Sequence, residues 1–275
     1  MSAQSARHRL RRAMLQTTAR AIGQGSQQPA TTTPQRLLLI RPDHLGDVLW
    51  LTPALHALRQ RLPDAAIAVA AGPWSRPVLA NNPDLDDLLV IDFPGFERRP
   101  KRSPVAPYQL LAAEAKRLRL WGFDTAVVLR DDHWWGALLA ATAGIQRRLG
   151  YRHPDVAPFL TESLPLPGHE HTAIGNLRLA DALLRRAGQA SLLDAATVPP
   201  TDFPLVFHPG DDAEARVNEL LAPLPSDGRP LVAIHPSAGV PVKLWDEGRL
   251  SVWRTASPPS SARESCSPAA PVTSR

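Results

Sequence analysis

A carboxylate directly after the first predicted strand is the clearest candidate for chemistry in this sequence. Residues 36–41 (RLLLIR) form an apolar run typical of a buried parallel strand, and the turn PDHLGD that follows ends in Gly46 and Asp47. Ligands of open α/β sheets bind outside the carboxyl ends of the strands. Gly46 lets the backbone turn tightly and leaves room for a ligand. Asp47 is therefore either a base that accepts a proton from a bound hydroxyl or a simple cap at a helix start.

A second group of candidate residues is basic. The segment FERRPKR follows the third predicted strand, and loops in that position line the ligand sites of α/β sheets. A dense charge run of this kind is either solvated or in contact with an anionic ligand. Its four cations are Arg98, Arg99, Lys101 and Arg102.

Aromatic residues follow the fourth predicted strand. Trp134 and Trp135 come after the polar residues 131–133, at the expected start of a helix. The two indoles are either buried beneath a helix that begins with an aspartate or stacked on the ring of a ligand. His171 and Asn176 are predicted to lie at the start of a later helix.

These candidates lie on a regular alternation of strands and helices. Short apolar runs alternate with longer segments that carry Leu and Ala on one face. Such alternation predicts a parallel sheet covered by helices on both faces. The predicted strands span residues 36–41, 66–71, 88–92, 125–130 and 148–151, and the predicted helices span 48–62, 107–121, 134–143 and 172–187.

Composition divides the chain into five parts. The first contains five arginines and no acid, and it predicts a disordered basic tail, with an amphipathic helix on an anionic membrane surface as the alternative. A Rossmann-like domain comes next, and a linker rich in Pro, Asp and Ala follows it. A further strand at 230–235 begins a second unit, and the last part has no periodicity and is expected to be disordered. The predicted parts are residues 1–35, 36–188, 189–229, 230–250 and 251–275.

The composition also excludes several classes of protein. The chain has 275 residues, of which 44% are hydrophobic and 21% charged, as in globular proteins. It contains no run of about 18 apolar residues, so no membrane span is predicted. Cys266 is the only cysteine, which excludes an internal disulfide framework and a cysteine-based zinc site. Neither a G-x-G-x-x-G dinucleotide motif nor a P-loop follows the first strand.

Six blocks of the sequence resemble glycosyltransferase family 9, the ADP-heptose:lipopolysaccharide heptosyltransferases. The first block is IRPDHLGDVLWLTPALHALRQRLPDAAIAV, which holds Gly46 and Asp47. The others follow in order: AGPWSRPVL, NNPDLDDLLVID, FDTAVVLRDDHWWGALLAATAGIQRRLGY, HTAIGNLRLADALL and LVAIHPSAGVPVKLWDEGR, so that the resemblance covers residues 36–250. It implies an α/β fold of the GT-B type, in which two Rossmann-like domains face each other across a cleft. This chain would hold a complete N-terminal acceptor domain and only the start of the nucleotide-sugar domain.

The resemblance also implies roles for individual residues. Asp47 would be the general base that deprotonates the acceptor hydroxyl for attack on the anomeric carbon with inversion, and Gly46 would border the acceptor. In the second unit, Lys243 would neutralise the donor phosphates, while Ser237 and the backbone at Gly239 would donate hydrogen bonds to them. The basic loop would bind the anionic acceptor.

The function implied by the resemblance is transfer of a heptose from ADP-heptose to the lipopolysaccharide inner core. It needs no metal or other cofactor, and its partners are the nucleotide-sugar and the core acceptor, without nucleic acid. The expected location is the cytoplasm of a bacterium, with peripheral contact at the inner membrane as a further expectation. The alternatives are a non-catalytic remnant that binds the acceptor, another nucleotide-sugar glycosyltransferase of GT-B fold, and an unrelated α/β nucleotide-binding protein.

The segment after Leu250 predicts a change of reading frame. The family continues past KLW with a helix, a strand and a Gly-rich turn, whereas residues 251–275 consist mainly of Ser, Pro, Arg and Ala. Back-translation with GC-rich codons, with one base restored in codon 250, yields an amphipathic helix, a glycine stop and an apolar strand. The hypothesis is a single-base deletion, and it predicts weak or no transferase activity for this chain.

Overall fold

The structure, a computed structural model, describes residues 12, 14–20, 33–96, 103, 105–166, 168–193, 203–224, 231 and 243–246. The chain divides into two compact units, Met1–Leu220 and Leu221–Arg275, and each is described by itself. Among the helices of these residues, none combines the length and the apolar character that a membrane crossing requires.

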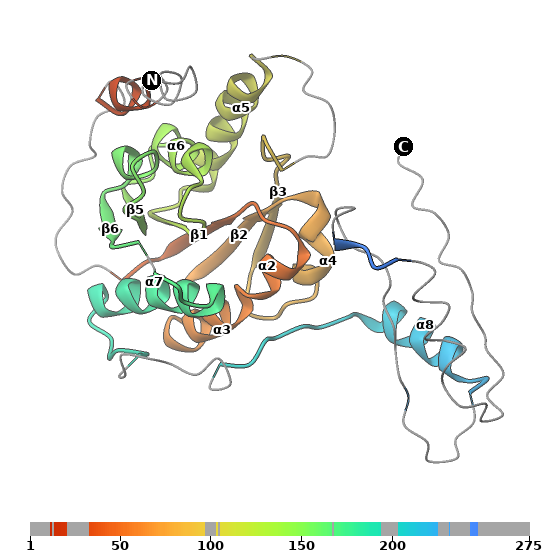
Figure 1. Ribbon diagram of the computed structural model, residues 1–275. Helices are drawn as coiled ribbons and strands as arrows, with labels where there is room; N and C mark the ends of the chain where they lie inside the picture. Colours follow the sequence, from red (N-terminus) through yellow and green to blue (C-terminus); the bar gives the residue numbers. More distant parts are fainter. Residues whose placement is uncertain are drawn as a thin grey trace. The chain divides into compact units, whose positions relative to one another are not determined.

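The first unit is built on a six-stranded sheet with the order β3-β2-β1-β4-β5-β6 (Figure 1). Every neighbouring pair of strands is parallel. This order, with the first strand in the middle, is that of a Rossmann sheet, so the prediction of a parallel α/β sheet is confirmed. The strands are β1 (Arg36–Arg41), β2 (Ala66–Ala71), β3 (Asp87–Val90), β4 (Thr125–Val128), β5 (Arg147–Tyr151) and β6 (Glu162–Leu164).

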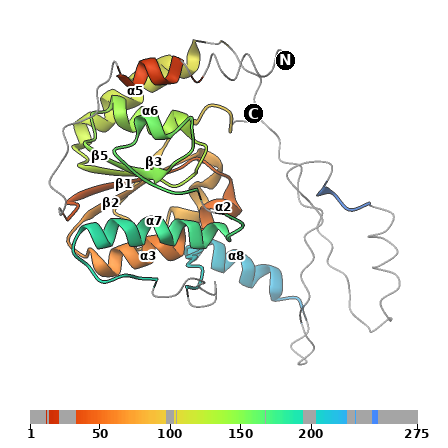
Figure 2. The same ribbon diagram turned by 60° about the vertical axis from the view of Figure 1, so that its left-hand side comes forward.

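Helices cover both faces of this sheet (Figure 2). The longer ones are α3 (Thr52–Arg61) and α7 (Thr172–Arg186) on one face, and α5 (Ala106–Trp121) and α6 (Trp134–Thr142) on the other.

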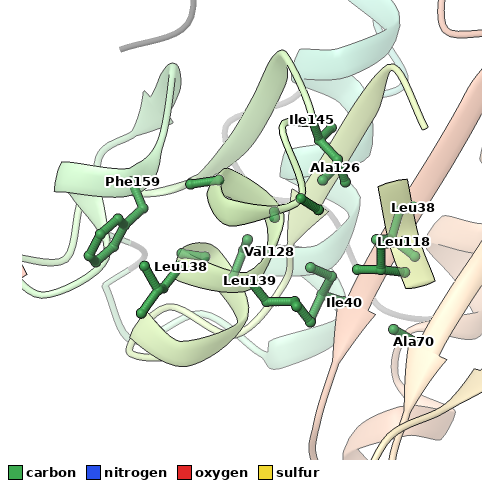
Figure 3. Close-up of a cluster of buried hydrophobic side chains, with 14 of the residues drawn as sticks. Leu38, Ile40, Ala70, Leu118, Ala126, Val128, Leu138, Leu139, Ile145 and Phe159 are labelled. Carbon is green, nitrogen blue, oxygen red and sulfur yellow. The ribbon is translucent and has the colours of Figure 1, made fainter. Parts of the chain in front are cut away.

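The side chains of β1 alternate between the two hydrophobic clusters that result. Leu37 and Leu39 pack with α3 and α7, whereas Leu38 and Ile40 pack with α5 and α6. Figure 3 shows Ile40 beside Leu139 in the cluster on the side of α5 and α6. All four of these β1 side chains are fully buried, which explains the continuous apolar run of the strand.

The helix predicted at 48–62 is in fact two helices. α2 (Leu45–Leu49) ends before α3 begins, and the chain turns between them at Trp50 and Leu51. Pro53 lies in the first turn of α3 and has no N–H to donate into a preceding helical turn. The hydroxyl of Thr52 donates instead to the carbonyl oxygen of Leu49 at 2.8 Å. The break therefore starts a new helix where the sequence pattern alone predicted one continuous helix.

Part of the predicted N-terminal tail is helical. Residues 14–20 form a helix on the same side of the sheet as α5 and α6 (Figure 1). Leu15 is 7% exposed and joins the hydrophobic cluster on that side, and Arg12 forms an ion pair with Asp155 at 3.4 Å. The expectation of disorder is therefore wrong at these residues, because an apolar side chain of the segment finds a place in the core.

The segment predicted as a linker also contains regular structure. α8 (Asp211–Leu221) lies within residues 189–229, and none of its described side chains is buried. Its acidic first turn suits a helix N-terminus. In the second unit, the strand predicted at 230–235 lies outside the described residues apart from Leu231, which is exposed. The small elements that the sequence did not predict are η1 (Pro73–Ser75), α4 (Arg76–Leu79), η2 (Ala157–Phe159) and β6.

Candidate functional site

The candidate site lies at the carboxyl ends of β1 and β4, in the centre of the sheet. From β1 the chain proceeds to β2 and β3 on one side, and it then crosses to β4 on the other side. α2 and α3 therefore leave β1 toward one face of the sheet, and α6 leaves β4 toward the opposite face. The point where the strand order reverses is where α/β proteins bind their ligands.

Asp47 lies at this position in the first turn of α2 and is half-buried. Within the part of the chain that the structure describes, no hydrogen bond or ion pair engages its carboxylate. The N-cap residue of α2 is His44, not Asp47, which excludes the alternative of a simple capping aspartate. A β-carbon added at the neighbouring Gly46 would meet no atom within 4 Å, so space is open beside the carboxylate.

A buried carboxylate, Asp43, links the ends of β1 and β4. It is 2% exposed. Its Oδ2 lies 2.8 Å from Nε of Arg41, and its Oδ1 accepts a hydrogen bond from Nη1 of Arg130. Its backbone carbonyl oxygen accepts hydrogen bonds from Nε1 of Trp74 at 2.8 Å and from Oγ of Ser75 at 2.7 Å. Asp43 therefore connects the turn after β1 to the segments that follow β2 and β4.

The two arginines that contact Asp43 differ in their surroundings. Burial lowers the pKa of Arg41 below its usual value, although the charges of Asp43 and Asp47 oppose this effect. Burial acts in the same direction on Arg130, but its hydrogen bond to Asp132 and the charge of Asp43 outweigh it and raise the pKa. Nε of Arg130 donates to Asp132 at 2.5 Å, and its guanidinium lies 5.3 Å from the centre of the Phe96 ring.

Two residues at the start of α7 contact the residues around the end of β1. Oδ1 of Asn176 accepts a hydrogen bond from Nη1 of Arg41 at 3.4 Å, and its Nδ2 donates to the carbonyl oxygen of Trp50 at 2.9 Å. His171 caps α7 by accepting a hydrogen bond from the backbone N–H of Ala173. Its ring meets the indole of Trp50 edge-on, with 4.9 Å between the ring centres. Both residues predicted at this helix start therefore contact residues of the β1–α3 segment.

The two tryptophans after β4 have separate positions. Trp135 is 2% exposed, and its Nε1 donates a hydrogen bond to the carbonyl oxygen of Pro107 at 3.1 Å. This confirms the interpretation of a buried indole for Trp135, while Trp134 is half-buried. The expected aspartate at the helix start is wrong, because the cap position belongs to a histidine. His133 is the N-cap residue of α6, and it is buried beside the rings of Phe93 and Phe96.

Several predicted site residues lie elsewhere or outside the described residues. Lys243 is exposed in the second unit. Within the described residues no group of three or more His, Cys, Asp or Glu side chains could hold a metal ion, and a metal-free reaction stays a prediction. The predicted residues that lie outside the described ones are Arg98, Arg99, Lys101, Arg102, Ser237 and Gly239.

The ion-pair network of Arg41, Asp43 and Arg130 was not predicted from the sequence. A signal for it was present, because charged residues follow the apolar runs of β1 and β4 immediately. The rule that identified Asp47 applies equally to these positions.

Comparison with solved structures places this arrangement in a known fold. A family 9 glycosyltransferase from Veillonella parvula superposes with a TM-score of 0.57 at 22% identity, over 79% of this chain and 57% of that one. The ADP-heptose lipopolysaccharide heptosyltransferase II of E. coli gives a TM-score of 0.54 at 20% identity, over 80% of this chain and 61% of that one. Over the superposed residues, this chain has the fold of these two glycosyltransferases.

The E. coli heptosyltransferase WaaC with ADP is also similar to this chain, with a TM-score of 0.52 at 17% identity over 81% of this chain. The sequence itself matches no protein-family model and no curated protein. The chain spans 57% to 65% of the length of these three structures. The fold predicted from the sequence resemblance is thereby confirmed for the parallel α/β sheet.

Proposed function

We propose that this chain is a family 9 glycosyltransferase that moves a heptose from ADP-heptose to the lipopolysaccharide inner core with inversion. The observation that carries the proposal is the position of Asp47. Its carboxylate lies at the carboxyl end of β1, at the reversal of strand order, with open space beside Gly46. The shared fold with a heptosyltransferase and a family 9 glycosyltransferase supports the same assignment.

In this mechanism, Asp47 accepts the proton of an acceptor hydroxyl as that oxygen attacks the anomeric carbon. The new bond joins the acceptor oxygen to the anomeric carbon, and the bond from that carbon to the phosphate oxygen breaks. ADP departs with the electron pair. Because the attack occurs in a single displacement from the opposite side, the configuration inverts. A cation such as Lys243 would stabilise the charge on the leaving diphosphate.

The acceptor is expected to be anionic, and the cations that bind it would be Arg98, Arg99, Lys101 and Arg102. The two described arginines at the site are already in ion pairs with Asp43 and Asp132. A location in the cytoplasm, with peripheral contact at the inner membrane, remains part of the proposal.

The role of Asp47 is tested by Asp47→Asn in a chain whose reading frame has been restored. The substitution keeps the shape of the side chain but removes the proton acceptor. We expect kcat to fall by about 10²- to 10⁴-fold, with acceptor binding nearly unchanged. Transfer is measured as ADP release, and acceptor binding as a calorimetric titration. An equal loss of binding and turnover would contradict the assignment.

A second candidate function is acceptor binding without catalysis. It is favoured by the six-stranded sheet of the first unit, whose strand ends hold Asp47 and the ion pairs of Asp43. The 275-residue chain should then bind the lipopolysaccharide core without releasing ADP from ADP-heptose. Detectable heptose transfer by this chain would overturn that alternative and the expectation of weak activity.

A further inference from the structure

The buried Asp43 and the candidate base Asp47 share the charged neighbour Arg41. Asp43 and Asp47 lie on the same turn, and both act on the charge of Arg41. The charge of Asp47 raises the pKa of Arg41, so the two groups attract each other. Arg130, on the neighbouring strand end, carries the second positive charge of this cluster. Within the described residues, no hydrogen bond or ion pair joins either arginine to the Asp47 carboxylate.

The hydrogen-bond partners of the two arginines explain why. Nε of Arg41 lies against Asp43, and its Nη1 donates to the carbonyl oxygen of Leu129 at 3.2 Å and to Asn176. Arg130 is held between Asp43 on its buried side and Asp132 on its exposed side. Asp43 is the only carboxylate among the described residues that forms ion pairs with both arginines.

We infer that Asp43 is a positioning residue that holds Arg41 and Arg130 and thereby leaves the Asp47 carboxylate free. The inference rests on the proposed role of Asp47 as the base. A carboxylate in a direct ion pair with a guanidinium has its lone pairs occupied and is stabilised in its ionised form, so it accepts a proton less readily. Asp43 would prevent that by satisfying both cations itself.

The other charged groups around Asp47 do not take over this role. Asp131 and Asp132 follow β4. The charge of Asp131 also acts on Arg41, but no hydrogen bond or ion pair joins the two among the described residues. Asp132 pairs with Arg130 alone, and its side chain is 49% exposed. His133 is neutral, because burial and the charge of Arg130 lower its pKa to about 3. His44, at the start of α2, is exposed. Removal of Asp43 would therefore leave Arg41 with neutral acceptors only, and Asp47 would be the carboxylate still available on its own turn.

The test is the crystal structure of the Asp43→Asn variant of the 275-residue chain at neutral pH. We expect a guanidinium nitrogen of Arg41 or Arg130 within about 3 Å of the Asp47 carboxylate. In a frame-restored chain carrying the same substitution, kcat should fall by about 10²-fold while the KM for the acceptor changes little. A structure in which Asp47 stays unpaired after the substitution would overturn the inference.

A second variant keeps the test decisive if Asp43→Asn does not fold, since two buried cations would then lack a counter-charge. The double variant Asp43→Asn with Arg130→Met removes one negative and one positive charge together. Arg41 remains as the released cation, and we expect it to pair with Asp47. If Arg41 keeps its neutral partners in this variant, Asp43 is not what holds it away.

Two matched controls separate this role from a general structural one. Asp124 also links β1 and β4, at the amino ends of these strands. Its Oδ2 accepts hydrogen bonds there from the backbone N–H groups of Gln35 and Arg36. Asp124→Asn should lower stability and leave Asp47 unpaired. Asp132→Asn should leave Arg130 on Asp43, and movement of Arg130 onto Asp47 in that variant would contradict the inference. These structures do not depend on turnover, so failure of the proposed transfer reaction would be seen separately.

Discussion

His133 is buried as a neutral side chain beside the candidate site. It is 5% exposed, and neither ring nitrogen has a hydrogen-bond partner among the described residues. The rings of Phe93, Phe96 and Trp135 surround it. Burial is the main cause that lowers its pKa to about 3, and the charge of Arg130 adds to the effect.

This environment predicts an acid-sensitive fold. The folded pKa of His133 is about 3, whereas an unfolded histidine has a pKa of about 6.5. Between these values the unfolded chain binds the extra proton, so the free energy of unfolding decreases as the pH falls, by up to about 1.4 kcal/mol per pH unit. His133→Phe should flatten this dependence in urea denaturation at pH 7, 6 and 5. His208→Gln, at an exposed position, is the control, and an unchanged slope in His133→Phe would contradict the assignment.

The residues of the site were only partly predictable from sequence. Asp47 and Gly46 could be identified because a single strand followed by a glycine turn fixes their place in any Rossmann sheet. Asp43 could not be identified as a link, because its partner Arg130 lies 87 residues further along the chain. The sequence does not show which strands are neighbours, so it does not show which strand ends share their charges.

At the scale of the elements, alanine substitutions at two helical glycines are predicted to change the free energy of unfolding in opposite directions. A β-carbon at Gly136 of α6 would lie 2.5 Å from Nδ1 of His133 and 3.0 Å from Cγ2 of Ile40, in a region that the aromatic rings fill. Gly136→Ala should therefore lower the free energy of unfolding by about 1–3 kcal/mol, although alanine favours a helix.

Gly46→Ala is the matched case in α2, where an added β-carbon meets no atom within 4 Å. Its free energy of unfolding should stay the same or rise by up to about 1 kcal/mol. Acceptor binding, if it occurs at this position, should weaken. Urea denaturation and acceptor titration of both variants check the pair, and equal stability of the two would show that the helix–sheet contact at Gly136 is not tight.

The elements were predicted where a continuous apolar run or apolar residues at helical spacing mark them in the sequence. β1 and β2 have the predicted bounds, and α5, α6 and α7 differ from prediction by one residue at an end. The prediction did not detect the break between α2 and α3, because both helices carry apolar residues at helical spacing. It also did not detect β6, whose three residues are all half-buried and carry no apolar run.

At the scale of the whole molecule, the hypothesis of a single-base deletion makes a direct prediction. Resequencing of the gene near codon 250 should recover the missing base, and the neighbouring frame should encode a helix followed by a strand. If the residues after Leu250 belong to a nucleotide-sugar domain, the restored chain should bind ADP more tightly than the 275-residue chain. Confirmation of the present base sequence, with no such segment in the neighbouring frame, would refute the hypothesis.

β1 is held at both of its ends by acidic side chains. Asp124, which precedes β4, accepts hydrogen bonds from the backbone N–H groups of Gln35 and Arg36 at one end. At the other end, Asp43 pairs with Arg130, which follows β4. Both faces of this strand carry buried apolar side chains. A shift of its register by one residue would therefore still bury leucines on each face of the sheet. We therefore expect the contacts at the two ends of β1, and not its apolar side chains, to select the register of β1 against β4. A change at either end should first appear as misaligned molecules during refolding.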